Sequence, residues 1–228
     1  MEINGNNLHI IDMEVIIMRR RCMMLRVAMG LICIVMITMT TITTYRQKDM
    51  LTLQRGIANE LIRFHVRANS DSYEDQQLKL LVKTSVVTYI QPFLSESDSL
   101  DTSRQILTSH IDDIDEVARQ TLADNGSDYD VKVYFEESYF PMKTYGDVTL
   151  PPGEYEAFRI DIGKSEGKNW WCVLYPPLCF VDATHGELPD ESMEELRNIL
   201  TDDEYDAVTD TDYKVQFKYL TVLNELMD

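Results

Sequence analysis

The stretch LIRFHVRANSDSYEDQQLKLLVK, residues 61–83, changes its hydrophobic period partway along and so predicts two kinds of secondary structure in succession. Up to Ala68, apolar and polar residues alternate, which is the period of a β-strand with one buried face. Residues 69–72, Asn-Ser-Asp-Ser, are typical of a turn followed by a helix cap. Over about 74–94, apolar residues recur three and four positions apart, as in an amphipathic helix. On the strand, the alternation places Ile62, Phe64, Val66 and Ala68 on one face and Arg63, His65 and Arg67 on the other.

The rest of the body shows the same two periods in separate groups. Helices are predicted over about 102–124, 191–200 and 220–228, and strands over 131–136, 154–162, 170–175 and 213–219. Because the strand over 170–175 is apolar at every position, it is predicted to be central and covered on both faces. Grouped strands and grouped helices predict an α+β fold. We expect an antiparallel-dominated sheet with two long helices on one side, preceded by an N-terminal membrane or signal helix.

The N-terminus carries a charge pattern that is typical of a membrane or signal segment. Residues 19–21 and Arg26 are arginines, and residues 27–45 after them contain no charged residue and are about long enough to cross a bilayer core. Positive flanks remain in the cytoplasm, so the rest of the chain is expected outside. No A-x-A cleavage site follows, which slightly favours an uncleaved anchor. The predicted organisation is a disordered extension over 1–17, a signal peptide or signal anchor over 18–46, a linker or juxtamembrane helix over 47–60, and an extracytoplasmic α+β domain over 61–228.

Charge is distributed unevenly along the 228 residues, whose formal net charge is −18. Residues 1–46 hold five Lys or Arg against three Asp or Glu, whereas residues 47–228 hold 16 against 36. A body this acidic repels phosphate backbones and anionic lipid headgroups. The composition therefore argues against nucleic-acid binding, because the sequence lacks the basic patch that such binding needs.

The four cysteines fall into two pairs. Cys22 and Cys33 lie in or beside the membrane segment, whereas Cys172 and Cys179 lie in the stretch NWWCVLYPPLCFVD, residues 169–182. An even number of cysteines in an exported body favours a disulfide between Cys172 and Cys179. Two free buried thiols are the alternative.

A Cys/His hydrolase is a competing interpretation of the same stretch. Cys172 or Cys179 would attack the substrate, and His65 would be the base. The simpler alternative makes His65 an ordinary residue of a polar strand face and both cysteines structural. The spacing of the cysteines and histidines lacks the close C-x2-C or H-x3-H pairs of zinc sites. No G-x-S-x-G, Walker A, H-E-x-x-H or G-x-G-x-x-G motif occurs, so neither a metal nor a cofactor is predicted.

The stretch SYFPMKTYGDVTLPPGEY, residues 138–155, concentrates aromatic residues and prolines in a segment too long for a simple turn. Long loops are often functional, and aromatic side chains favour interfaces. The segment is therefore a candidate recognition loop that contains Tyr145 and Asp147. The alternative is that its aromatic residues cover the core.

Three stretches together resemble the stage II sporulation protein R family. They are IRFHVRANSDSYEDQQLKLLVK over 62–83, YFPMKTYGDVTLPPGEYEAFRIDIG over 139–163 and NWWCVLYPPLCFVD over 169–182, and the tail YKVQFKYL is similar to the family's end. The resemblance covers about residues 57–228. It implies a signalling protein of endospore-forming Firmicutes that the forespore exports into the space between the two septal membranes.

The resemblance also implies a partner and a mode of action. The exported protein would activate the membrane-embedded aspartic peptidase of the mother cell, which processes the sigma-E precursor. The resemblance implies no enzymatic activity and no cofactor, and it leaves open whether the N-terminal segment is cleaved. The matching motifs suggest a candidate functional surface made of Arg63, His65, Asn69, Asp71, Tyr145, Asp147, Trp170 and Trp171.

Overall fold

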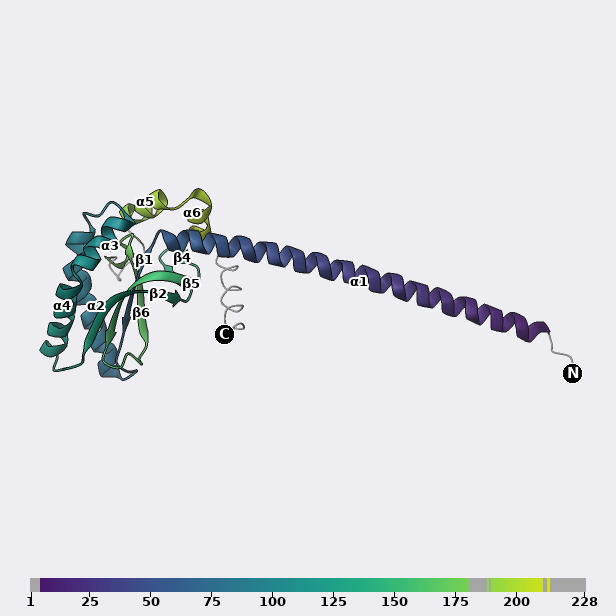
Figure 1. Ribbon diagram of the computed structural model, residues 1–228, viewed down its shortest axis with the longest axis horizontal. Helices are drawn as coiled ribbons and strands as arrows, with labels where there is room; N and C mark the ends of the chain where they lie inside the picture. The colour runs from purple at the N-terminus through teal and green to yellow at the C-terminus, as the bar shows by residue number, and fades with distance from the viewer. Residues whose placement is uncertain (1–4, 181–187, 189, 211–212, 214–228) are drawn as a thin grey trace. The chain divides into compact units, whose positions relative to one another are not determined.

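The computed structural model describes residues 5–180, 188, 190–210 and 213 of the chain (Figure 1). The chain divides into two compact units, Met1–Leu51 and Thr52–Asp228. The predicted α+β class is confirmed: the second unit combines a mostly antiparallel sheet with several helices.

The first unit is helical. Helix α1 spans Gly5–Asn59, so its last residues belong to the second unit. Its portion Met18–Asn59 contains an 18-residue window of mean hydropathy 2.2, none of it buried, and is long and apolar enough to cross a membrane. Residues 5–17, part of the extension that was predicted to be disordered, lie within this helix, and no proline in them interrupts it. The segment 47–60 is likewise helical as far as Asn59.

The centre of the second unit is a four-stranded sheet with the order β2-β5-β1-β6. Strand β1 pairs in parallel with β5, and the other two pairings are antiparallel. Strand β6 is therefore an edge strand, and its predicted central position is wrong, although most of its residues are buried. A continuous apolar run indicates that both faces of a strand are buried, and an edge strand can also be buried on both faces. The strands are β1 (Ile62–Arg67), β2 (Val131–Phe140), β5 (Gly153–Ile162) and β6 (Asn169–Tyr175).

Helices α2 (Tyr73–Leu94) and α4 (Ile111–Asp124) cover one face of the sheet (Figure 1). Their apolar stripes pack with those of α3 (Leu100–Ser109) against β1 and β5, where Phe64 and Phe158 are fully buried. The single helix predicted over 102–124 is in fact α3 followed by α4. The chain leaves helical geometry at His110, with φ −103° and ψ 11°.

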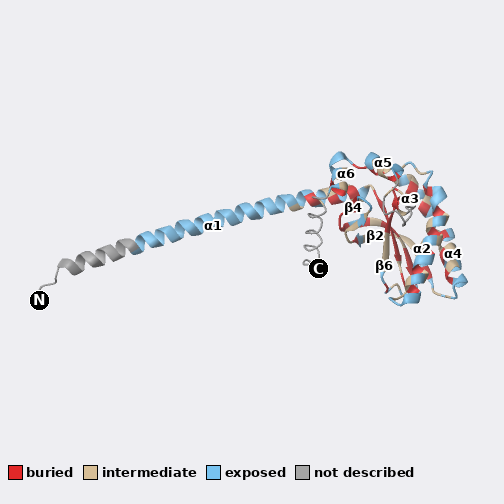
Figure 2. Ribbon diagram, turned by 180° about the vertical axis from the view of Figure 1, so that it is seen from behind, coloured by how far each residue is buried: buried red, intermediate tan, exposed pale blue. Residues whose placement is uncertain are grey.

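The opposite face of β1 is also covered, because a second apolar cluster packs on it. Residues from this cluster lie in the end of α1, in β5 and β6, and in α5 (Asp190–Ile199) and α6 (Asp202–Thr209). Figure 2 shows buried residues along the central strands. The alternation of β1 correctly assigns its two faces, but the exposed polar face that it predicts is wrong: Arg63 is 0% exposed and His65 is 3% exposed.

The candidate recognition loop is largely regular structure. Strand β2 continues to Phe140, and a hairpin follows that consists of β3 (Lys143–Tyr145) and β4 (Val148–Leu150). All three residues of β4 are buried, so this segment mainly covers the sheet, as the alternative interpretation had it. Helix α5 agrees with the helix predicted over 191–200, whereas α6 was not predicted. The elements predicted over 213–219 and 220–228 lie outside the described residues, apart from Tyr213.

The turn between β1 and α2 is fixed by a network around the buried carboxylate of Asp75. Asn69 Nδ2 and Ser70 Oγ donate hydrogen bonds to Asp75 Oδ2 at 2.8 Å and 2.5 Å. Asn69 Oδ1 accepts a hydrogen bond from the backbone N–H of Lys164 at 2.9 Å, which ties this turn to the β5–β6 turn. Burial alone would raise the pKa of Asp75, but the hydrogen bonds from Ser70 and Asn69 outweigh it and leave the pKa below its ordinary value.

We expect Asp75→Asn to lower the free energy of unfolding by about 1–3 kcal/mol near pH 7, because a buried charged acceptor is lost. A lowered carboxylate pKa stabilises the fold above the unfolded-state pKa of 3.8, and this contribution disappears as pH falls through the folded-state pKa. The difference between wild type and variant should therefore shrink in acid. Urea unfolding of the full chain in detergent micelles, at pH 7 and in acid, measures the difference in the free energy of unfolding at each pH. Glu74→Gln, which removes an exposed charge from the neighbouring position, is the matched control, and equal stability of the two variants would contradict the expectation.

Cys172 and Cys179 form a disulfide, with their Cα atoms 5.6 Å apart, whereas Cys22 and Cys33 are free and exposed. Thiol counting on the denatured, unreduced chain should therefore find two reactive thiols. The double variant Cys172→Ser, Cys179→Ser should lower the free energy of unfolding by about 2 kcal/mol, because the cross-link restricts the unfolded chain. Cys22→Ser with Cys33→Ser is the control and should leave it unchanged. A count of four reactive thiols would contradict the disulfide between Cys172 and Cys179.

Candidate functional site

Alternate residues of β1 point away from α2 and α4, and their neighbours across the sheet form two polar rows. In the first row, His65 lies beside Arg159 of β5 and Trp171 of β6. In the second, Arg67 lies beside Asp161 and Asn169. Strand β2 extends the rows with Tyr134 and Lys132, and Glu136 lies one row further along. We call this the polar sheet face, made of His65, Arg67, Lys132, Tyr134, Glu136, Arg159, Asp161, Asn169 and Trp171.

The half of the polar sheet face on β2 and β5 is held by an ion-pair network. Arg159 Nε donates to Asp161 Oδ1 at 2.7 Å, and Arg159 Nη1 donates to Glu136 Oε1 at 2.5 Å. Tyr134 Oη donates to the other oxygen of Asp161 at 2.9 Å. Burial together with the Asp161 carboxylate raises the pKa of Tyr134 to about 12, so the hydroxyl remains a donor at neutral pH. The charges of Glu136, Arg159 and Asp161 are therefore paired with one another.

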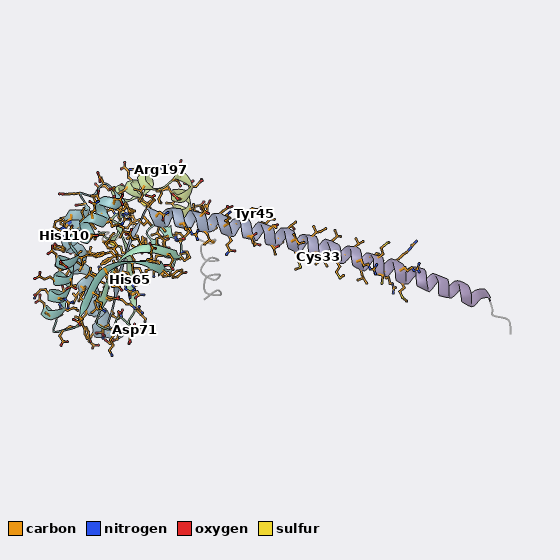
Figure 3. The ribbon with its side chains drawn as sticks, in the orientation of Figure 1. Cys33, Tyr45, His65, Asp71, His110 and Arg197 are labelled. Atoms are coloured by element: carbon orange, nitrogen blue, oxygen red, sulfur yellow. A yellow bond between two sulfur atoms is a disulfide. The ribbon has the colours of Figure 1, made fainter. Side chains whose placement is uncertain are left out.

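His65 lies in the other half, within the sheet (Figure 3). Its ring stacks on Trp171 at 4.1 Å between centroids and meets the edge of Phe140 at 6.0 Å. Burial lowers the pKa of His65, and the nearby Asn169 side chain only partly offsets this effect, so the imidazole is neutral at pH 7. Neither ring nitrogen makes a hydrogen bond of ordinary geometry.

Two neighbours of His65 share this lack of partners. The Nε atom of Arg67 and the Oδ1 atom of Asn169 are buried and make no hydrogen bond. The two residues are cross-strand partners, one row from His65. Sequence reasoning did not select Arg67 or Asn169 as site residues. The alternation of β1 could have selected Arg67, because it places Arg67 on the same face as His65.

Arg63 is surrounded by aromatic rings, and its contacts link the β3–β4 hairpin to the sheet. Its guanidinium carbon lies over the rings of Phe140 at 4.3 Å, Tyr155 at 4.9 Å and Tyr145 at 5.9 Å. Its Nε donates to the carbonyl of Cys172 at 3.1 Å, and its Nη2 donates to Tyr145 Oη at 3.1 Å. Burial raises the pKa of Tyr145, although Arg63 opposes this shift. Arg63 and Tyr145 therefore join the β3–β4 hairpin to the sheet.

The remaining residues of the candidate surface are dispersed. Asn69 and Asp71 belong to the β1–α2 turn, where Asp71 Oδ1 accepts the backbone N–H of Lys168 at 2.7 Å. Asp147 is exposed between β3 and β4. Trp170 lies on the helix-covered face, 5.9 Å from Phe64 between ring centroids. The structure thus brings only His65 and Trp171 of the eight predicted residues together on the polar sheet face.

The Cys/His pair of a hydrolase is not formed. Cys172 is bonded to Cys179 and belongs to the cluster under the helices, whereas His65 faces the opposite side of the sheet. A cysteine in a disulfide supplies no thiolate for attack. Among the described residues that were searched, no three His, Cys, Asp or Glu side chains are grouped so that they could hold a metal ion.

Comparison with known proteins identifies relatives of the sheet-containing unit. The family model described as stage II sporulation protein R matches residues 58–185, a segment that contains all six strands of the described part of the chain. The chain is also 40% identical over 131 residues to Stage II sporulation protein R of Bacillus subtilis (strain 168), over 58% of this chain and 58% of that protein. The chain thus matches less than two thirds of the length of this relative. No solved structure matches the chain. Because the family model covers more than half of its residues, the chain belongs to the stage II sporulation protein R family.

Proposed function

We propose that this protein is an exported signal of endospore formation that activates the membrane-embedded aspartic peptidase responsible for processing the sigma-E precursor. Family membership carries the proposal, because the match over residues 58–185 includes the whole sheet and its polar face. The family ties the chain to sporulation, and the activation of a peptidase is the step that we propose.

The location of the protein is part of the proposal. Arginines at the start of an apolar helix favour a topology in which the helix crosses the forespore membrane and Thr52–Asp228 lies outside it. A disulfide between Cys172 and Cys179 supports an oxidising, extracytoplasmic compartment. The space between the forespore and mother-cell membranes fits both features, and the peptidase partner would lie in the facing membrane.

We further propose that the protein acts by binding and not as an enzyme. A hydrolase would need a nucleophile beside His65, and the neighbours of His65 on its face of the sheet are Arg67, Arg159 and Trp171. Side chains of this kind suit recognition of a polar partner surface. The contact with the peptidase would then be made through the polar sheet face.

Processing of the sigma-E precursor in non-sporulating cells tests the proposal. Cells that co-express the peptidase, the precursor and the full chain should produce the processed form, and cells without the chain should not. The variant Cys172→Ser, Cys179→Ser should trigger processing to a similar extent where its abundance equals that of wild type, because the cysteines have no chemical role. Immunoblotting of precursor and product, normalised to the amount of chain, gives the readout.

Two outcomes would count against the proposal. No processing with the wild-type chain would remove the activation step. A cysteine variant that is folded, equally abundant and silent would instead restore a chemical role for these residues. Circular dichroism of the purified variant checks that it is folded.

A further inference from the structure

The buried polar atoms that lack a partner are concentrated in one place. Within the described part of the chain, five buried side-chain N or O atoms make no hydrogen bond, and four of them belong to His65, Arg67 and Asn169. The fifth is Nη1 of Arg63 in its aromatic surroundings. Native structures rarely leave such atoms unpaired, because each one costs the free energy of its lost hydration. Each of the four atoms has less than 1 Å² of exposed surface, so a ligand reaches them only when a half-exposed neighbour such as Arg67 or Trp171 changes its rotamer. Their concentration on adjacent residues points to a ligand that completes the site after that change.

Arg67 also differs from the half-buried arginines Arg104 and Arg159 in its charge environment. Arg159 on the neighbouring strand contacts two carboxylates, and Arg104 also contacts two. Among the ion pairs found in the described residues, none involves Arg67. The Asp161 carboxylate, which lies beside Arg67 across the strands, is held by Arg159 and Tyr134 instead. A carboxylate is therefore the group that the site lacks.

The unpartnered atoms define the rest of the ligand. Neutral His65 offers one N–H donor and one acceptor nitrogen, Arg67 offers the Nε–H donor, and Asn169 offers an acceptor oxygen. A carboxylate accepts from Arg67 and His65, and a neighbouring backbone N–H donates to Asn169. A phosphomonoester dianion has no donor for Asn169, and a metal cation is repelled by Arg67. Both the charge and the mixture of donors and acceptors thus fit an acidic residue within a peptide chain.

We propose that His65, Arg67 and Asn169 form a carboxylate-binding subsite that recognises an acidic side chain in an extended segment of a partner protein. The half-exposed ring of Trp171 lies against His65 and packs on the methylene groups of that side chain. The inference rests on the proposed function only for the identity of the partner, which would be an extracytoplasmic segment of the peptidase. The type of group that the subsite binds is inferred from the residues of the sheet face alone.

The position of Trp171 makes binding visible by fluorescence. Trp170 lies on the other face of the sheet and is the only other tryptophan, so a Trp170→Phe background isolates the signal of Trp171. The probes are two capped pentapeptides, acetyl-Gly-Gly-Glu-Gly-Gly-amide and its Gln counterpart. They are titrated into the full chain in detergent micelles. We expect the Glu peptide to change Trp171 emission saturably and the Gln peptide to leave it unchanged at the same concentrations.

Matched variants distinguish binding of the Glu peptide at the subsite from nonspecific electrostatic attraction to the protein surface. Arg67→Gln should weaken binding of the Glu peptide by roughly tenfold or more, because it removes a charged hydrogen-bond donor. Lys164→Gln removes the same charge from an exposed position outside the polar sheet face, in the β5–β6 turn, and should change binding by less than about twofold. Arg67→Lys keeps the charge without the forked donor geometry and should bind with intermediate affinity. Circular dichroism confirms that each variant is folded.

The inference is overturned if both peptides bind equally, if Arg67→Gln binds as wild type does, or if Lys164→Gln loses as much affinity as Arg67→Gln. If Arg67→Gln does not fold, the comparison of the two peptides on the wild-type site and on Arg67→Lys decides the question. Precursor processing by the wild-type chain is measured separately. Its absence counts against the proposed function, whereas selective binding of the Glu peptide still supports the subsite.

Discussion

The structure depends on the burial of both faces of β1, and above all on the way in which the Arg63 guanidinium is accommodated. A cation that is 0% exposed and paired with no carboxylate among the described residues would cost several kcal/mol without compensation. Here the rings of Phe140, Tyr145 and Tyr155 surround it, and two hydrogen bonds hold it. Those same contacts join β6, β2 and the β3–β4 hairpin to β1. The accommodation of one side chain thus fixes how the second face of the sheet is covered.

This arrangement divides the second face into two parts. Around Arg63 the hairpin and the apolar cluster that includes Leu61 and Val173 close over the sheet. From His65 onward, towards the end of β1 at Arg67, polar residues replace apolar ones on all four strands. On β2 and β5, Tyr134, Glu136, Arg159 and Asp161 are hydrogen-bonded to one another, whereas between β1 and β6 buried polar atoms make no hydrogen bond. The corner between β1 and β6 is therefore where a partner could supply the missing hydrogen bonds, once a half-exposed side chain there moves aside.

Much of the fold could be predicted from the sequence, and the failures share a physical cause. The strand over 61–68, the helix over 74–94 and the Cys172–Cys179 disulfide follow from local periodicity and residue chemistry, and all three are present. Periodicity reports which residues share a face, but not what packs on that face. It therefore gave Arg63 and His65 an exposed position that tertiary packing removes. The edge position of β6 is likewise a property of topology, which short-range patterns do not encode.

Knowing what packs on each face also changes how the family motifs are interpreted. The motif over 62–83 contains residues whose roles the structure explains without a partner: Arg63 braces the hairpin, and Asn69 and Asp71 fasten one turn to another. His65 and Arg67 lie in the same motif, yet both ring nitrogens of His65 and the Nε atom of Arg67 make no hydrogen bond in the described chain. Unsatisfied buried groups reduce stability, and proteins retain them chiefly where function compensates. The residues that weaken the fold are therefore better indicators of the binding surface than the residues that hold it together.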